Sequence, residues 1–249
     1  MHIVVHRTVD EATLAAAELV GRSLLERPKL TLGLAAGATM VHLYRTLSER
    51  AANERPRRLT FSEATLFALD EYRGLATTHP GSCRRFLERH LFGMVDVNPR
   101  HVDSLDGRCA DPAAECARYE RALEAAGGID LQILGIGVNG HIGFNEPGSA
   151  FDSRTRLVRL SEATRRQNAA AWGGNHENVP AEALTMGIGT ICAARACLLL
   201  AFGGAKAPAV KAAVEGPSTP DVPASALQRH PNATFILDDL AASRLSRGR

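Results

Sequence analysis

The feature that most constrains the fold is a repeated order of short apolar runs, polar or glycine-rich turns, and helical patterns. The apolar runs are "KLTLGLA" (29–35), "ATLFALDEY" (64–72), "IDLQILGIG" (129–137), "ACLLLAFGG" (196–204) and "ATFILDD" (233–239). We interpret each of them as a strand, and "MHIVVHR" at the start of the chain as another. Strands that alternate with helices are typical of a parallel or mixed sheet. The sequence therefore predicts an α/β fold with an open, mostly parallel, doubly wound sheet and helices on both faces.

Helices are predicted where a capping residue precedes an amphipathic pattern. The segment "DPAAECARYERALEAAGG" (111–128) has Asp111 at the N-cap position of such a helix. Asp10 is expected to cap another helix near the start of the chain, with Leu14 on the inner face of that helix.

Length and composition limit the number of domains. With 249 residues, of which 45% are hydrophobic and 22% are charged, the chain can bury a full core as one large α/β domain. No internal repeat or low-complexity linker marks a boundary, so we expect one domain over residues 1–249. The segment at about 161–180 is less regular at its end, and it is expected to be either a lid or an ordinary surface connection.

Charge and cysteine content argue against several kinds of partner. The formal net charge is +2, from 29 basic and 27 acidic residues, and no block of like charges indicates nucleic-acid or lipid binding. The five cysteines are odd in number and never spaced as Cys-x-x-Cys, which favours reduced thiols over disulfides or a zinc site. No apolar run approaches about eighteen residues. We therefore expect a cytoplasmic protein without a metal site, a nucleic-acid partner or a membrane partner.

Two glycine-containing turns follow predicted strands, at the position where α/β sheets bind ligands. The first turn contains Gly37, Ala38 and Thr39, and the last leads to Lys206. Backbone N–H groups at the start of a helix, together with the lysine, suit an anion such as a phosphate. The alternative is that the glycines serve only the tight connection between strand and helix.

Acid/base side chains follow two other predicted strands. They are Asp70, Glu71, Asn139, His141 and Glu146. The last three belong to "GIGVNGHIGFNEPG", a glycine-rich loop that can fold back, so we expect a hydrogen-bonded pair of His141 and Glu146. Taken singly, Asp70 is more often a cap and His141 an ordinary loop histidine. As a set, these groups favour an enzyme that moves protons on a small anionic ligand without a metal or an organic cofactor.

Longer motifs resemble one known family in order and spacing. They are "FALDEYRGL" (67–75), "HPGSCRRFL" (79–87), "GIGVNGHIGFNEPGSAFDSRTR" (135–156), "ALTMGIGTICAA" (183–194) and "GGAKAPAVKAAVEG" (203–216). The pattern is similar to the glucosamine-6-phosphate deaminase (isomerase/deaminase) family, within the glucosamine-6-phosphate isomerase/6-phosphogluconolactonase superfamily. The resemblance extends from about Leu32 to Asp238. Its most specific part is G-x-N-G-H-I-G-F-N-E-P, because the lactonases do not usually continue as F-N-E-P.

The resemblance implies an isomerisation coupled to deamination, in which glucosamine 6-phosphate and water become fructose 6-phosphate and ammonia, without a cofactor. By position, Asp70 is the base that moves a proton between C2 and C1 of the open sugar. His141 helps to open the ring by acting at the ring oxygen, Glu146 orients His141, and Asn139 stands where some members have an aspartate. The amino sugar phosphate is expected to lie against Gly37, Ala38, Thr39, Gly137 and Lys206.

The phosphate site departs from the family pattern. Ala170 occupies the position at which family members carry an arginine that grips the phosphate, and the first glycine turn keeps only Thr39 as a hydroxyl. Losing a charge-assisted partner costs about 1.5–3 kcal/mol. Arg165 and Arg166 are candidates to replace the missing arginine, and the alternative is that both face solvent.

Three hypotheses stay open at this point. The first is the isomerase/deaminase of glucosamine 6-phosphate, acting in amino sugar metabolism such as N-acetylglucosamine catabolism. The second is a deaminase/isomerase of a different amino sugar, which Ala170 motivates. The third is a non-catalytic domain that senses sugar phosphates, although such sensors normally carry a helix-turn-helix ahead of the sheet. Val158 replaces a lysine of the allosteric members, so we expect weak or absent allostery; a homo-oligomer stays open.

Overall fold

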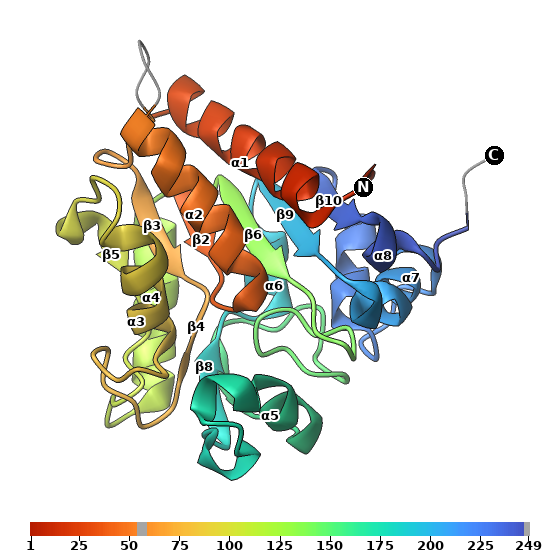
Figure 1. Cartoon of the computed structure of the whole chain (residues 1–249). Coiled ribbons are helices and arrows are strands. Elements are labelled where there is room, and N and C mark those ends of the chain that lie inside the picture. The colour runs from red at the N-terminus through yellow and green to blue at the C-terminus, as the bar shows by residue number, and fades with distance from the viewer. Residues whose placement is uncertain (54–58, 247–249) are drawn as a thin grey trace.

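The largest element of the structure is a seven-stranded sheet (Figure 1). This computed structural model describes residues 1–53 and 59–246. Within these residues the strand order is β1-β10-β9-β6-β2-β3-β5, and every recorded pairing between neighbouring strands is parallel. The strands are β1 (His2–His6), β2 (Thr31–Leu34), β3 (Thr65–Ala68), β5 (Val102–Asp103), β6 (Leu131–Gly135), β9 (Ala196–Ala201) and β10 (Ala233–Asp238). The predicted α/β class with an open parallel sheet is confirmed.

Helices cover both faces of this sheet. In Figure 1, α1 (Val9–Glu26) and α2 (Ala38–Asn53) lie across its front, and α6 (Ile188–Cys192) lies behind it. The other α-helices are α3 (Cys83–Leu87), α4 (Pro112–Ala125), α5 (Glu162–Asn168), α7 (Ala207–Glu215) and α8 (Asp239–Ala242). The inner strands are covered from both sides, and all four residues of β2 are buried. This double burial explains why these strands appear in the sequence as continuous apolar runs.

A smaller antiparallel sheet adjoins the carboxyl edge of the large one. It has the order β4-β8-β7 and consists of β4 (Asp70–Tyr72), β8 (Glu182–Thr185) and β7 (Arg156–Arg159). The run 64–72, predicted as one strand, is therefore two strands in different sheets. The change comes at Leu69, whose N–H donates to the carbonyl of β2 (2.8 Å) and whose carbonyl accepts from Met186 beyond β8 (3.0 Å). Neither β7 (RLVR) nor β8 (EALT) is anticipated from the sequence, because neither forms a continuous apolar run.

The predicted helix features have mixed outcomes. Asp111 caps α4 as predicted. The N-cap of α1, however, is Thr8 and not Asp10, because Thr8 has the extended backbone and its hydroxyl accepts an N–H of the first turn (3.1 Å). Leu14 is 59% exposed, so its predicted place on the inner face is wrong. The buried positions of α1 follow the helical period from Ala12, which leaves Leu14 on the opposite side.

The strand order brings four strand ends side by side. β9, β6, β2 and β3 occupy adjacent places in the large sheet. The strand order reverses between β2 and β6. The strands beyond β2 are β3 and β5 and lead to one edge of the sheet, whereas the strands beyond β6 are β9 and β10 and lead toward the other edge. Open α/β sheets bind ligands at such a reversal, beyond the carboxyl ends of the strands. The glycine turn after β2 and the loop after β6 flank this point.

Candidate active site

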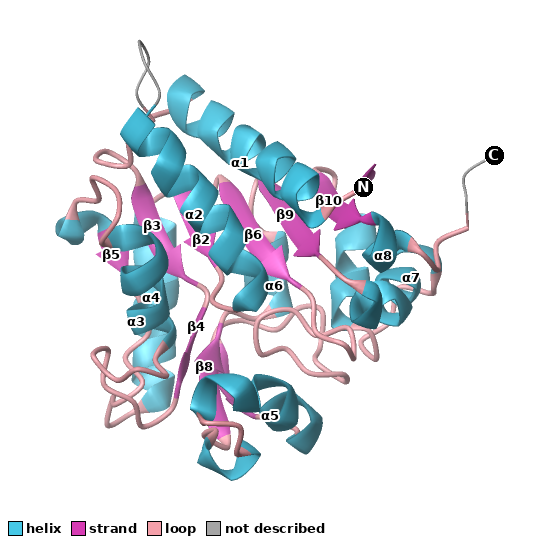
Figure 2. Ribbon diagram, viewed as in Figure 1, coloured by secondary structure: helices cyan, strands magenta, loops and turns pink. Residues whose placement is uncertain are grey.

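The candidate site lies where the carboxyl edge of the large sheet meets the small sheet. Figure 2 shows the loop after β6 between the large sheet and α5. Within this loop, Phe144 donates its N–H to the hydroxyl of Thr185 (3.1 Å), and its ring centroid lies 4.9 Å from that of Tyr72. Thr185 is also the register partner of Asp70. The loop after β6 and the end of β3 are therefore packed against the same strands.

Asp70 is a buried carboxylate with few hydrogen-bond donors. It opens β4, and only 7% of its surface is exposed. Burial raises the pKa of this carboxyl to about 7; the neighbouring thiol of Cys83 opposes the rise, and the charge of Glu71 adds to it. A carboxyl that titrates near neutrality can both accept and return a proton. Asp70 thus has the properties that a general base needs.

Glu71 has the opposite surroundings, although it is the next residue. It is fully buried. Its carboxylate accepts hydrogen bonds from the N–H groups of Tyr72 (2.8 Å), Cys83 (3.0 Å) and Arg84 (3.1 Å) and from the hydroxyl of Ser82 (2.6 Å). Most of these donors belong to the start of α3, so the carboxylate caps that helix and ties it to β4. Glu71 is an anchor; burial outweighs these hydrogen bonds and raises its pKa, and the acid/base contribution expected of it stays a prediction.

A chain of hydrogen bonds joins Glu146, Asn139 and His141 in the loop after β6. The amide nitrogen of Asn139 donates to Glu146 Oε2 (3.0 Å), and Asn139 Oδ1 lies 2.7 Å from Nδ1 of His141. The predicted direct pair of His141 and Glu146 is therefore wrong, because Asn139 stands between them. An amide that donates to a carboxylate on one side presents its oxygen on the other, so Nδ1 carries the proton. His141 is held in the tautomer whose Nε2 has the lone pair.

His141 is neutral at physiological pH. Burial lowers its pKa to about 4; the charge of Glu146 acts in the opposite direction, and that of Lys206 adds to the lowering. The imidazole lies against the backbone of Gly137, where an added Cβ would come within 2.2 Å of Nδ1. Glycine is required at this position to leave room for the ring. The predicted contact of Gly137 with the substrate stays a prediction.

Glu146 also fastens the loop to the start of α5. Its Oε1 accepts from the N–H and from the hydroxyl of Ser161, both at 3.0 Å. The hydroxyl of Thr164 donates to the same carboxylate and lies 3.4 Å from Nδ1 of His141. Burial acts to raise the pKa of Glu146, but these hydrogen bonds together outweigh burial and hold the pKa below its usual value. Glu146 is therefore a fixed anion that positions its neighbours.

Lys206 and the start of α2 form the cationic side of the site. Lys206 ends the short 3₁₀ helix η5 (Gly204–Lys206) and is partly buried, which lowers its pKa. Its effect on the pKa of His141 reflects the proximity of the two side chains. Gly37 and Gly203 have φ values of 136° and 84°, with open space where a side chain would lie. The binding of an anion by the N-terminal N–H groups of α2 and by the lysine stays a prediction.

Neither candidate arginine replaces the one expected at Ala170. Arg165 donates to two backbone carbonyls farther along the chain (3.0 and 3.1 Å), and Arg166 pairs with Glu162 one turn earlier on α5. Ala170 itself is exposed. The hypothesis that Arg165 or Arg166 compensates for Ala170 is therefore not supported, because both guanidinium groups are already paired elsewhere.

The segment predicted as a lid folds as α5 and two short 3₁₀ helices, η3 (Ala169–Trp172) and η4 (His176–Asn178). Its Trp172 ring lies 5.4 Å from the ring of Tyr72 and stacks on His79 at 5.6 Å (centroid distances). These contacts fasten η3 to the segment after β4. The movement of this segment stays a prediction.

Three side chains at the site are not anticipated from the sequence. Cys83 affects the pKa of Asp70, Ser161 binds Glu146, and Thr164 helps to lower the pKa of Glu146. Ser161 alone has a local signal, because it is the N-cap of α5 and accepts the N–H of Thr164 (3.1 Å). The contacts themselves join elements that are distant along the chain, so no short motif reveals them.

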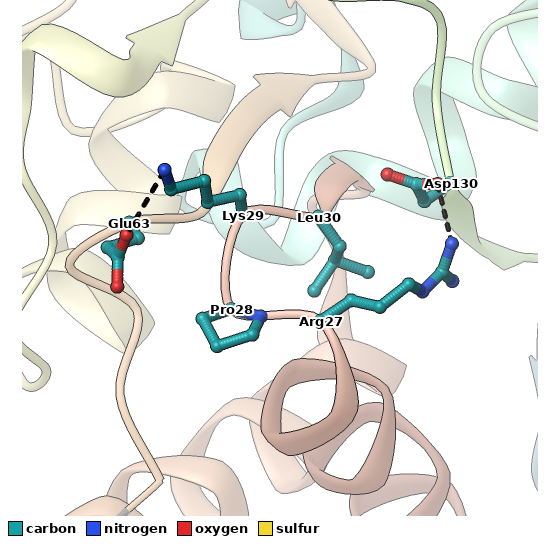
Figure 3. A pocket seen from close by; sticks show the side chains of 6 residues that line it. All are labelled: Arg27, Pro28, Lys29, Leu30, Glu63 and Asp130. Carbon is teal, nitrogen blue, oxygen red and sulfur yellow. Dashed lines mark hydrogen bonds and ion pairs between the residues drawn. The ribbon is translucent and has the colours of Figure 1, made fainter.

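A separate pocket lies at the opposite, amino edge of the large sheet (Figure 3). It is lined by the segment before β2 and by Asp130, one residue before β6. Ion pairs join Arg27 to Asp130 (2.8 Å) and Lys29 to Glu63 (3.9 Å) across it. Because its charged groups are paired and the acid/base residues lie at the other edge, this pocket is not the candidate site.

The residues that the structure describes contain no group of three or more His, Cys, Asp or Glu side chains able to hold a metal ion. In the same part of the chain, no helix is long and apolar enough to cross a membrane. An open parallel sheet with proton-transferring groups and a lysine at its carboxyl edge defines an α/β protein of the class that acts on small anionic ligands. The family model for Glucosamine-6-phosphate isomerases/6-phosphogluconolactonase matches residues 6–236, and the chain belongs to this family.

Individual relatives agree with this assignment. The chain is 44% identical to the glucosamine-6-phosphate deaminase of Beutenbergia cavernae, with 98% of this chain and 93% of the relative covered. It is 47% identical to that of Cellvibrio japonicus, with 95% and 89% covered. A solved structure of a monomeric glucosamine-6-phosphate deaminase has a TM-score of 0.94 and 40% identity, with 98% of this chain and 100% of the other covered. A 6-phosphogluconolactonase from Trypanosoma brucei, at a TM-score of 0.75 and 22% identity, shares the fold. The family resemblance found in the sequence is confirmed.

Proposed function

We propose that this protein converts glucosamine 6-phosphate and water to fructose 6-phosphate and ammonia. The observation that carries the proposal is the pair of complementary groups at one edge of the sheet. Asp70 is a carboxyl with a pKa of about 7, and His141 is a neutral imidazole with a lone pair on Nε2. The names of the relatives, which are 44–47% identical, support the substrate.

His141 opens the sugar ring in this proposal. Its Nε2 accepts the proton of the anomeric hydroxyl and returns it to the ring oxygen as the bond between C1 and that oxygen breaks. Asn139 holds the Nδ1–H at 2.7 Å, and Glu146 holds Asn139 at 3.0 Å, so the imidazole keeps the required tautomer. The fixed negative charge of Glu146 also stabilises the imidazolium that forms between the two transfers.

Asp70 then moves a proton between two carbons of the open chain. It removes the C2 proton while the ammonium group gives a proton to the C1 oxygen, which yields an enolamine with a hydroxyl on C1. Asp70 then returns its proton to C1, which leaves an iminium at C2. Water adds to C2, and ammonia leaves, so the net reaction is a hydrolytic deamination with isomerisation. Positioned proton transfer of this kind contributes typically about 10²–10⁴-fold to the rate.

The phosphate is bound by Lys206 and by the N–H groups at the start of α2, with Gly37, Ala38 and Thr39 in the turn. An arginine is absent at position 170, so we expect this site to bind the phosphate about ten- to a hundredfold more weakly than one with that arginine.

Ammonia release by the purified protein tests the proposal. Glucosamine 6-phosphate and unphosphorylated glucosamine are compared side by side, and the ketose product is identified. Release from the phosphate ester alone, with fructose 6-phosphate as product, is the expected result. No release from either compound by folded protein would contradict the proposal.

A different amino sugar is the second candidate substrate, and Ala170 is the observation that favours it. In that case unphosphorylated glucosamine, or another amino sugar, would release ammonia at least as fast as the 6-phosphate does. The acid/base groups would act in the same way, because they act on the ring oxygen, C1 and C2, which any amino aldose has.

The broader setting follows from the proposed chemistry. We propose a role in amino sugar metabolism, including N-acetylglucosamine catabolism, in the cytoplasm, and we propose that residues 161–180 act as a lid on a single domain. Sedimentation of the purified chain tests the remaining alternatives of monomer and homo-oligomer.

A further inference from the structure

Asp238 lies at the carboxyl edge of the large sheet, where it ends β10, and no step of the proposed mechanism uses it. We propose that Asp238 is a positioning residue, whose carboxylate holds the glycine turn after β9 and thereby places Lys206 against the phosphate of the substrate. This inference rests on the proposed function, in which Lys206 binds that phosphate.

The strand order places Asp238 beside the turn that leads to Lys206. The neighbour of β10 is β9, and Leu237 is the register partner of Ala201, the last residue of β9. Only 3% of the surface of Asp238 is exposed. Its Oδ1 accepts the N–H of Gly203 at 2.9 Å. This contact joins two adjacent strand ends that are 35 residues apart along the chain.

The turn depends on such a contact because its backbone is otherwise weakly restrained. Gly203 has φ 84° and ψ 151°, a combination that essentially only glycine adopts. An added Cβ at Gly203 or Gly204 would meet no atom within 4 Å apart from those of adjacent residues. Glycine also has the most backbone freedom to lose when it is ordered. The hydrogen bond to a buried carboxylate therefore restricts the orientation of the Gly203 peptide.

The restricted peptide is bonded directly to the lysine. The carbonyl of Gly203 accepts the N–H of Lys206 (3.0 Å) and closes the turn of η5. The lysine side chain is partly buried, and its charge contributes to lowering the pKa of His141. Two hydrogen bonds in series thus connect Asp238 to the backbone of Lys206, so the lysine side chain starts from a fixed point beside the acid/base groups.

A second contact holds the carboxylate itself. The same Oδ1 accepts the N–H of Ala241 (2.9 Å), because Asp238 is the N-cap of α8. A serine hydroxyl caps a helix about as well as a carboxylate does, but its oxygen lies one bond closer to the main chain. Serine should therefore cap α8 and fall short of Gly203. Capping and positioning can be separated by this difference in reach.

The first experiment compares KM and kcat for glucosamine 6-phosphate. Asp238→Ala should raise KM about three- to tenfold and change kcat less than about twofold, because the lysine loses its fixed position while the acid/base groups keep theirs. Asp238→Ser should raise KM by the same factor although α8 stays capped. Asp238→Asn keeps an oxygen acceptor for both N–H groups and removes a negative charge near the phosphate, so its KM should be at or below the native value.

The matched control is Asp111→Ala. Asp111 is the N-cap of α4, and its Oδ1 accepts two backbone N–H groups, those of Ala113 (2.9 Å) and Ala114 (3.1 Å). The substitution removes the same kind of cap away from the site, so KM and kcat should both stay at their native values.

The second experiment needs no turnover. Binding of inorganic phosphate to the purified protein is followed by phosphorus NMR. Asp238→Ala and Asp238→Ser should weaken this binding by about three- to tenfold, and Lys206→Ala should weaken it at least as much. If no amino sugar is turned over but phosphate binding is weakened in this way, the proposed function fails while the positioning role stands.

Three outcomes overturn the proposal, with thermal unfolding used to confirm that each variant compared is folded. The first is a native KM in Asp238→Ser or in folded Asp238→Ala. The second is a KM in Asp238→Asn as high as that of the serine variant, which would assign the effect to charge and not to the hydrogen bond. The third is a native protein that binds no phosphate, or that binds it no better than Lys206→Ala does.

Discussion

Two carboxylate regions of the site differ in the number of donors they receive. On the β4 side, burial raises the pKa of Asp70 to about 7, and the neighbouring thiol of Cys83 opposes the rise only in part. In the loop after β6, Glu146 receives donors from Asn139, Ser161 and Thr164, and its pKa is lowered. Burial dominates at Asp70, whereas hydrogen bonds dominate at Glu146, so Asp70 is the carboxylate suited to exchange protons and Glu146 the one suited to hold structure.

Asp70→Asn should have the largest effect, because it removes the group that exchanges protons. We expect kcat to fall by about 10²–10⁴-fold. Binding of the substrate, followed by calorimetry, should change little, since the amide has the same shape. Turnover of this variant at the native rate would show that Asp70 is not the base, and it would contradict the distinction drawn between Asp70 and Glu146.

The stability of two variants tests the comparison without turnover. The pKa of Asp70 in the folded protein lies above its value in the unfolded chain, so the folded state loses stability as pH rises from about 4 to about 7. Asp70→Asn should therefore raise the free energy of unfolding above pH 7, by on the order of 3 kcal/mol, and have little effect near pH 4.

Glu146→Gln should have the opposite sign. The folded pKa of Glu146 is lowered, so its contribution to stability is present above its unfolded pKa and is lost as pH falls. Replacing the carboxylate should cost about 1–3 kcal/mol at pH 8, because its donors lose a charged acceptor. Urea unfolding of both variants at pH 4 and pH 8 gives the comparison directly. Equal destabilisation by the two substitutions at pH 8 would contradict it.

Ala170→Arg tests the proposed phosphate site, which lacks the arginine that family members are expected to carry at this position. If the family geometry holds, the new guanidinium should lower the KM for glucosamine 6-phosphate by about ten- to a hundredfold. Ala171→Arg is the matched control, because it adds the same charge at the next exposed position. An equal effect of both substitutions would indicate general attraction and not a phosphate contact.

Much of the fold follows from the sequence because β2, β6, β9 and β10 are buried on both faces and appear as apolar runs. Their turns also locate the acid/base residues, since ligands bind at the carboxyl edge. The break at Leu69 is not visible, because the apolar pattern continues through it while the hydrogen bonds change from one sheet to the other. The bridge that Asn139 makes between Glu146 and His141 depends on side-chain geometry, which spacing along the chain does not encode.

Thr164→Val should have the smallest effect on turnover of the variants considered, and it tests a single donor near Glu146. Thr164 is 1% exposed, its hydroxyl lies 3.4 Å from Nδ1 of His141, and it helps to lower the pKa of Glu146. Because that distance is long and Glu146 keeps its other donors, we expect kcat to fall only about two- to fivefold. Thr164→Ser keeps the hydroxyl and is the control. A loss of kcat as large as that of Asp70→Asn would mean that the donors of Glu146 do not act as separate, partly redundant supports. Turnover would then depend on a single donor of Glu146 as strongly as it depends on the carboxylate of Asp70.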